Sequence, residues 1–151
     1  NCPKKQWDTF CSNHDKYKNE QPTWLQVYHH STGEELSRLY NQSHFAFLPR
    51  LKNVYHDLAF PIKLLEYTTF NKPILSTSCT ETKKYIDKYN IGIITSDHLE
   101  DYLNGLKDMI QLIMGEKTEY SQLKDNLRKA ALANTWLSRA RKVLEDAEIL
   151  S

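Results

Sequence analysis

Glycine is scarce in this sequence. The 151 residues include only four glycines, at positions 33, 92, 105 and 115. The glycine-rich loops that bind phosphates in dinucleotide-binding and P-loop proteins need two or three glycines within a few residues of one another, and neither motif can be written here. If the chain binds a nucleotide, the starts of helices and individual side chains must make the contacts.

The cysteines and histidines also lack the patterns of a metal site or a disulfide framework. Cys2, Cys11 and Cys79 are odd in number and include no Cys-x-x-Cys pair, so we expect reduced thiols. None of the six histidines shows the spacing of metal ligands, and His29 and His30 would point to opposite sides of a strand. The sequence therefore predicts neither a bound metal nor a resident cofactor.

Long apolar runs and a strong net charge are missing as well. No run approaches the roughly 18 apolar residues of a membrane span, and no signal-peptide pattern opens the chain. The formal net charge is +1, which creates no field that would favour nucleic acid. We therefore expect a soluble cytoplasmic protein that does not bind nucleic acid.

The remaining features are those of a globular α/β domain. Hydrophobic residues make up 40% and charged residues 26% of the chain, as is usual for one folded domain of this length. Apolar residues recur at helical and at strand spacing in turn. We expect strands over 24–28, 44–48, 74–77 and 91–95, and a loop over 50–60. We expect helices over 3–20 and 33–42, from Pro61 onward, from a capping box at 78–81 to about 89, and over 97–114. A last helical stretch should cover 118–150, with a break near 134–135.

Strands that alternate with helices predict a parallel, Rossmann-like sheet flanked by helices, with a helical C-terminal tail over 118–151. Ligands of such sheets bind outside the carboxyl ends of the strands. The loops 29–33, 49–61 and 77–81 follow expected strands and should lie at that edge. The candidate substrate contacts there are His30 and Ser31 in the first loop and Thr77 and Ser78 in the third. Helix capping explains the same hydroxyls without a ligand.

The helix expected after Pro61 carries the strongest functional signal. Pro61 suits the first helical position for two reasons. Its φ is fixed near the helical value, and its missing N–H costs nothing, because an N–H at that position would have no partner within the helix. Lys63 then lies in the first turn, where the helix dipole disfavours a cation by roughly 0.3–1 kcal/mol unless an anion is bound. Glu66 lies one turn later on the same face and can accept hydrogen bonds from ribose hydroxyls. An ordinary i, i+3 surface ion pair explains the same spacing.

Three short runs around this helix resemble a known family. The runs 61–67 (PIKLLEY), 71–75 (NKPIL) and 90–93 (NIGI) are similar to the C-terminal, donor-binding domain of group 1 glycosyltransferases with the GT-B fold, and the similarity extends over residues 24 to 136. The resemblance implies a substrate-binding helix that opens at Pro61. It also implies that Lys63 is the catalytic residue at the donor diphosphate and that Glu66 contacts the nucleotide ribose.

One position departs from the family pattern. Many members carry a second Glu eight residues before the one that corresponds to Glu66, near the transferred sugar, and this chain has Leu58 there. Asp57, one place earlier, is the candidate for the sugar contact. The retained Pro-x-Lys-x-x-Glu pattern fits subgroups that lack the first Glu.

The resemblance also implies partners. The donor is a nucleotide diphosphate sugar, and a hexosyltransferase-like enzyme would transfer its sugar to an acceptor hydroxyl, bound largely by an N-terminal domain absent from this chain. The family's opening strand, helix and second strand are absent before Pro3, so we expect 1–151 to be an N-terminally incomplete donor domain that is inactive alone. Peripheral membrane association through the full-length enzyme is a further expectation.

Alternatives remain open from the sequence. Another GT-B-like sugar-nucleotide enzyme, such as an epimerase, would share the sheet and the crevice. A non-catalytic scaffold held by its long C-terminal helices would use Lys63 and Glu66 only as an ion pair. In the tail, Trp136, Arg139 and Arg141 resemble the helix that crosses back toward the N-terminal domain in the GT-B fold, and a core Trp on an amphipathic helix explains them equally well.

Overall fold

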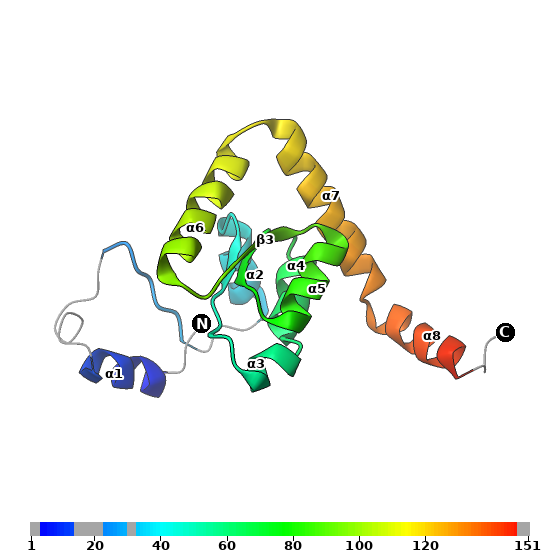
Figure 1. The fold of residues 1–151 in the computed structure, drawn as a ribbon, viewed down its shortest axis with the longest axis horizontal. Coiled ribbons are helices and arrows are strands. Elements are labelled where there is room, and N and C mark those ends of the chain that lie inside the picture. Colours follow the sequence, from blue (N-terminus) through cyan, green and yellow to red (C-terminus); the bar gives the residue numbers. More distant parts are fainter. Residues whose placement is uncertain (1–3, 14–22, 30–32, 148–151) are drawn as a thin grey trace. The chain divides into compact units, whose positions relative to one another are not determined.

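The computed structural model describes residues 4–13, 23–29 and 33–147, which form two compact units, Asn1–Leu39 and Tyr40–Ser151 (Figure 1). The first unit contains helix α1 (Lys4–Asn13) and most of helix α2 (Gly33–Gln42). Helix α2 has the predicted bounds, and α1 begins near its predicted start. The rest of the helix predicted to end at residue 20 lies outside the described residues.

The strand predicted over 24–28 is wrong. These residues form a turn and irregular backbone, and the side chain of Trp24 is 77% exposed. Alternation of apolar residues predicts a strand only where a neighbouring strand supplies hydrogen bonds and a core covers one face. Among the described residues, no strand pairs with this segment.

The second unit contains a parallel three-stranded sheet, as predicted. Its strands are β1 (Ala46–Leu48), β2 (Ile74–Thr77) and β3 (Gly92–Thr95), in the order β1-β2-β3. The register pairs Leu48 with Ser76 and Thr77 with Thr95, so the carboxyl ends of the three strands meet at one edge. Gly92 permits this pairing, because a Cβ there would lie 2.0 Å from the Ile74 carbonyl oxygen. The fold is α/β, consistent with a Rossmann-like arrangement.

Two crossovers connect the strands. The first contains α3 (Val54–Leu58) and α4 (Ile62–Thr69), and the second contains α5 (Thr80–Tyr89). The prediction of a loop over 50–60 is therefore wrong at residues 54–58, which form α3. The Asn53 side chain caps the start of this helix by accepting a hydrogen bond from the His56 amide at 2.8 Å. Pro61 is also the N-cap residue of α4 and not its first helical residue, because its ψ of 118° is extended.

Helices cover both faces of the sheet (Figure 1). Helix α6 (Leu99–Met114) packs closely on one face, where a Cβ at Gly105 would lie 2.4 Å from the Thr95 side chain and 3.1 Å from Leu75. Helices α4 and α5, together with α7 (Lys117–Ala133), lie on the other face. The core on that side consists of Leu64, Ile74, Tyr85, Ile86, Ile91, Leu127 and Ala130.

The C-terminal tail breaks at the predicted place. Helix α7 ends at Ala133 and α8 (Trp136–Asp146) follows, with the Thr135 side chain accepting a hydrogen bond from the Ser138 amide at 3.1 Å. Trp136 is 85% exposed, so it is not a core residue, and its ring lies 5.9 Å from the guanidinium carbon of Arg139. Within the described ranges, no helix is both long and apolar enough to cross a membrane.

Burial predicts how sensitive α7 is to truncation. Leu127 is fully buried in the core, whereas Leu132 on the same helix is 70% exposed. We expect Leu127→Ala to lower the free energy of unfolding by about 2–5 kcal/mol, because it removes core contacts and leaves a cavity. Leu132→Ala is the matched control and should change it by less than about 0.5 kcal/mol. Urea unfolding of both variants measures this, and equal losses would contradict the assigned core.

Candidate functional site

The segment that follows β1 lies across the carboxyl edge of the sheet. The Arg50 amide donates to the Thr77 hydroxyl oxygen at 3.0 Å, and that hydroxyl donates to the Arg50 carbonyl at 2.6 Å. Two residues later, the Lys52 amide donates to the Asp97 carboxylate at 3.0 Å, just beyond β3. The segment is thus held over the ends of β2 and β3, where parallel sheets bind ligands.

Asp57 joins the same segment to α5. Its carboxylate accepts a hydrogen bond from the Thr80 amide at 2.9 Å, and this bond lowers the pKa of Asp57 below its usual value. The carboxylate therefore caps α5, whose N-cap residue is Cys79 and not Ser78 as the capping-box spacing predicted. Contacts within the protein account for the side chains of both Asp57 and Thr77, and their predicted substrate contacts stay predictions.

A cavity of about 240 Å³ lies beneath this segment, lined by Pro49, Arg50, Leu51, Thr77, Asp97, Leu99 and Tyr102. Ligand pockets usually span about 300–1,000 Å³, so the cavity is small for a nucleotide. Ser78 is half-buried beside the end of β2. His30 and Ser31, the other predicted contacts, lie outside the described residues.

In the described part of the chain, the start of α4 shares the lack of a side-chain cap with α6 and α7, but those two helices have acidic residues in their first turns. Among the described residues, no side chain accepts a hydrogen bond from the N-terminal amides of α4, and its first turn contains no acidic residue. By contrast, Asn53 caps α3, Asp57 caps α5 and Thr135 caps α8. The amides of Ile62 and Lys63 therefore remain available to an anion, which the helix dipole would also favour.

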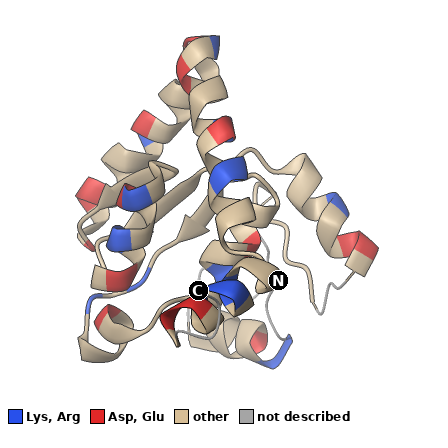
Figure 2. Cartoon of the chain, turned by 90° about the vertical axis from the view of Figure 1, so that its right-hand side faces the viewer, with Lys and Arg blue, Asp and Glu red and all other residues tan. Residues whose placement is uncertain are grey.

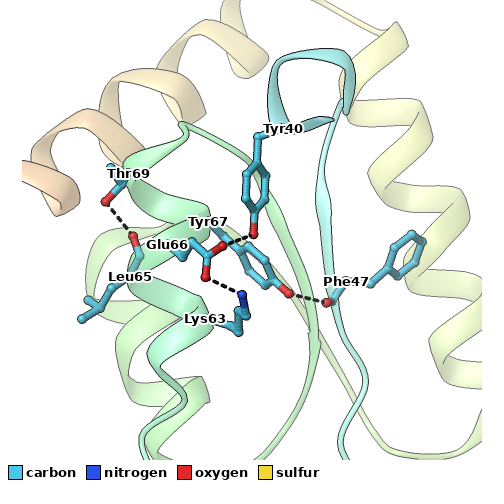
Figure 3. Close-up of polar contacts among 7 residues, drawn as sticks. All are labelled: Tyr40, Phe47, Lys63, Leu65, Glu66, Tyr67 and Thr69. Atoms are coloured by element: carbon cyan, nitrogen blue, oxygen red, sulfur yellow. Dashed lines mark hydrogen bonds and ion pairs between the residues drawn. The ribbon is translucent and has the colours of Figure 1, made fainter. Parts of the chain in front are cut away.

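Lys63 and Glu66 lie on the first turns of α4 and contact each other (Figure 3). The Lys63 ammonium nitrogen is 2.6 Å from Glu66 Oε2, and the two side chains are 55% and 22% exposed. The other oxygen of Glu66 accepts a hydrogen bond from the Tyr40 hydroxyl at 2.8 Å. The structure thus brings the two predicted residues together, with the cation facing solvent and the carboxylate held on both sides.

Tyr40 contacts the candidate site, and the sequence analysis did not select it. It lies on α2, 26 residues before Glu66, so no local spacing connects them. Burial and the hydrogen bond to Glu66 both raise the pKa of Tyr40, which keeps its hydroxyl protonated as a donor. Burial, with the nearby Glu66 charge, likewise raises the pKa of Tyr67, whose hydroxyl donates to the Phe47 carbonyl at 3.3 Å.

Charges of both signs are interspersed on the helices around this site (Figure 2). On α5, for example, Lys84 pairs with Glu81 at 2.7 Å and Lys83 pairs with Asp87 at 2.5 Å. Attraction for an anionic ligand must therefore come from local groups such as Lys63 and the free amides of α4, since screening weakens more distant charges. The described residues contain no group of three or more side chains placed to bind a metal.

Comparisons of the chain with protein-family models, with curated proteins and with solved structures find no match.

The bond between Asp57 and Thr80 predicts a pH effect on stability. Because the folded pKa of Asp57 is lowered, its ionised form stabilises the fold above the unfolded pKa of about 3.9, and this contribution is lost as pH falls through the folded pKa. Asp57→Asn should therefore be less stable than the wild type at pH 6–7, and the difference should shrink below pH 4. Urea unfolding at several pH values measures it.

Thr80→Pro provides the control for this prediction. Proline is tolerated at the first position of a helix, where Thr80 lies, and it removes both the amide and the side-chain hydroxyl of Thr80 that hydrogen-bond to Asp57. In the Thr80→Pro background, Asp57→Asn should lose most of its pH-dependent effect. A pH-dependent difference that persists there would contradict the assigned cap.

Proposed function

We propose that this chain is the donor-binding domain of a glycosyltransferase, one half of a GT-B architecture, and that it binds a nucleotide diphosphate sugar for transfer of the sugar to an acceptor hydroxyl. One observation carries the proposal. A lysine and a carboxylate lie together on the first turns of a helix without a side-chain cap, near the carboxyl end of a parallel strand. The family motif quoted above places the same residue types at the same spacing.

The start of α4 suits the diphosphate of the donor. A diphosphate there would accept hydrogen bonds from the amides of Ile62 and Lys63 and would interact favourably with the helix dipole. The Lys63 ammonium is more than half exposed and lies on a long, flexible side chain, so it can turn from Glu66 to a phosphate oxygen. A bound diphosphate would give the Lys63 ammonium a second anionic partner in a turn where the helix dipole disfavours a cation.

Glu66 suits the ribose. An ionised carboxylate has about four acceptor positions, of which Tyr40 and Lys63 occupy two. The remaining positions can accept hydrogen bonds from the vicinal hydroxyls of a ribose. Glu66 follows Lys63 by one turn, so the order along α4 is diphosphate and then sugar of the nucleotide.

Lys63 would also take part in the chemistry. Transfer breaks the bond between the sugar's anomeric carbon and the donor diphosphate oxygen, and negative charge develops on that leaving oxygen. An ammonium positioned there stabilises the charge more in the transition state than in the ground state. In a GT-B enzyme the acceptor lies largely on a second Rossmann-like domain, so turnover would require that domain together with this chain.

A non-catalytic scaffold is the second candidate, because Lys63 and Glu66 already pair with each other at 2.6 Å. A surface i, i+3 ion pair contributes only a few tenths of a kcal/mol and has no need of a ligand. Nucleotide binding that depends on both residues separates the two functions.

Calorimetric titration of the chain with UDP, GDP and ADP tests the proposal. We expect one of these diphosphates to bind, and we expect Lys63→Ala and Glu66→Ala each to weaken that binding by about 1–3 kcal/mol, the usual scale for losing a hydrogen bond to a charged group. The diphosphate that binds, UDP, GDP or ADP, identifies the base of the donor nucleotide.

Glu81→Ala and Lys84→Ala are the matched controls, since this pair has the same i, i+3 spacing at the start of α5. They should leave the affinity unchanged. Absence of binding by the folded chain, or binding that is indifferent to Lys63 and Glu66, would favour the scaffold.

A further inference from the structure

Glu66 is held in place by a residue from another helix. An ion pair with an exposed lysine leaves a carboxylate free to rotate, because the lysine side chain itself has many rotamers. The Tyr40 hydroxyl adds a second contact, at 2.8 Å from Glu66 Oε1. Figure 3 shows Tyr40 and Lys63 contacting different oxygens of the carboxylate, Tyr40 from α2 and Lys63 from α4. The Tyr40 hydroxyl is therefore the contact that limits rotation of the carboxylate.

Tyr40 is itself held firmly. Its ring stacks on Phe70, with centroids 4.3 Å apart and an interplanar angle of 14°, and it meets the edge of Tyr67 at 6.1 Å. Phe70 directly follows the last residue of α4, so the ring packs on the same helix that carries Glu66. A half-buried ring with two aromatic neighbours keeps its hydroxyl at a fixed point relative to α4.

Two tyrosines at this site thus have different partners. The Tyr67 hydroxyl donates to the Phe47 carbonyl of β1, and the Tyr40 hydroxyl donates to Glu66. Both hydroxyls lie in the same small region, but only one of them contacts the carboxylate (Figure 3). Removing the Tyr67 hydroxyl is therefore a control for removing the Tyr40 hydroxyl.

We propose that Tyr40 is the positioning residue for Glu66 and determines how strongly the site prefers ribonucleotides. This inference rests on the proposed nucleotide-binding function. When Lys63 turns to the diphosphate, the Tyr40 hydroxyl still holds Oε1, so the remaining acceptor positions of the carboxylate keep their direction and the vicinal hydroxyls of a ribose are the matching donors. A nucleotide without these hydroxyls leaves the acceptors unused and gains nothing from Tyr40.

The test compares a ribonucleoside diphosphate with its 2′,3′-dideoxy counterpart. For each variant of the 151-residue chain, calorimetry gives both dissociation constants and their ratio. We expect Tyr40→Phe to weaken binding of the ribonucleotide about tenfold, the scale of one hydrogen bond to a charged group, and to leave the dideoxynucleotide unaffected. The preference ratio should therefore fall by the same factor.

Tyr67→Phe is the matched control, because it removes one tyrosine hydroxyl from the same region without touching Glu66. It should leave the ratio as in the wild type. Phenylalanine keeps the stacking on Phe70, so Tyr40→Phe should remain folded, and thermal unfolding of both variants checks this. A loss that came only from weaker packing would affect the two nucleotides equally and would overturn the inference.

Two further outcomes separate the inference from the function on which it rests. If Glu66→Gln lowers the preference ratio and Tyr40→Phe does not, Glu66 contacts ribose without help from Tyr40, and only the inference fails. If the wild-type chain binds neither nucleotide, the nucleotide site itself is absent, and both the function and the inference fail.

Discussion

The packing of Leu64 against the core is the contact on which the candidate site depends. Leu64 is fully buried among residues of β2, α5 and α7, and Thr68, one turn later, is buried on the same side of α4. An i, i+4 pair fixes the rotation of a helix about its axis. With that face turned inward, Lys63 and Glu66 must lie on another face of α4. There, Tyr40 of α2 contacts Glu66, and Tyr67 contacts the Phe47 carbonyl of β1.

Hydrogen bonds at the carboxyl edge of the sheet are distributed unevenly. Thr77, Asp97 and Asp57 each accept a bond from a backbone amide of a neighbouring segment, so they hold the chain together over the ends of β2 and β3. The start of α4 receives no such partner from the described residues. These amides lie on an exposed turn, where water satisfies them in the free chain, and the proposed diphosphate would take the place of that water.

Local patterns in the sequence predicted most of the second unit. The bounds of β2 and the break at 134–135 follow from periodicity, proline and capping residues within a few positions. The failures involve partners that are distant or absent. The strand expected at 24–28 has no described strand to pair with, and α3 is too short for periodicity to reveal and depends on the Asn53 cap.

The same distinction applies to the site. Lys63 and Glu66 are three residues apart, so their contact could be predicted from helical geometry alone. The bond between Tyr40 and Glu66 spans 26 residues, and the exchange between Arg50 and Thr77 spans 27, so each depends on how the elements pack. Sequence spacing predicted the contact between Lys63 and Glu66, and only the fold shows that Tyr40 also contacts Glu66.

The most direct test of the account is an NMR titration of the isotope-labelled chain with the nucleoside diphosphate that binds most tightly, following each backbone amide. We expect the amides of Ile62 and Lys63 to shift the most and to saturate together, because the diphosphate would bind to them at the start of α4. Saturable binding whose largest shifts lie elsewhere, with those two amides unmoved, would contradict the account.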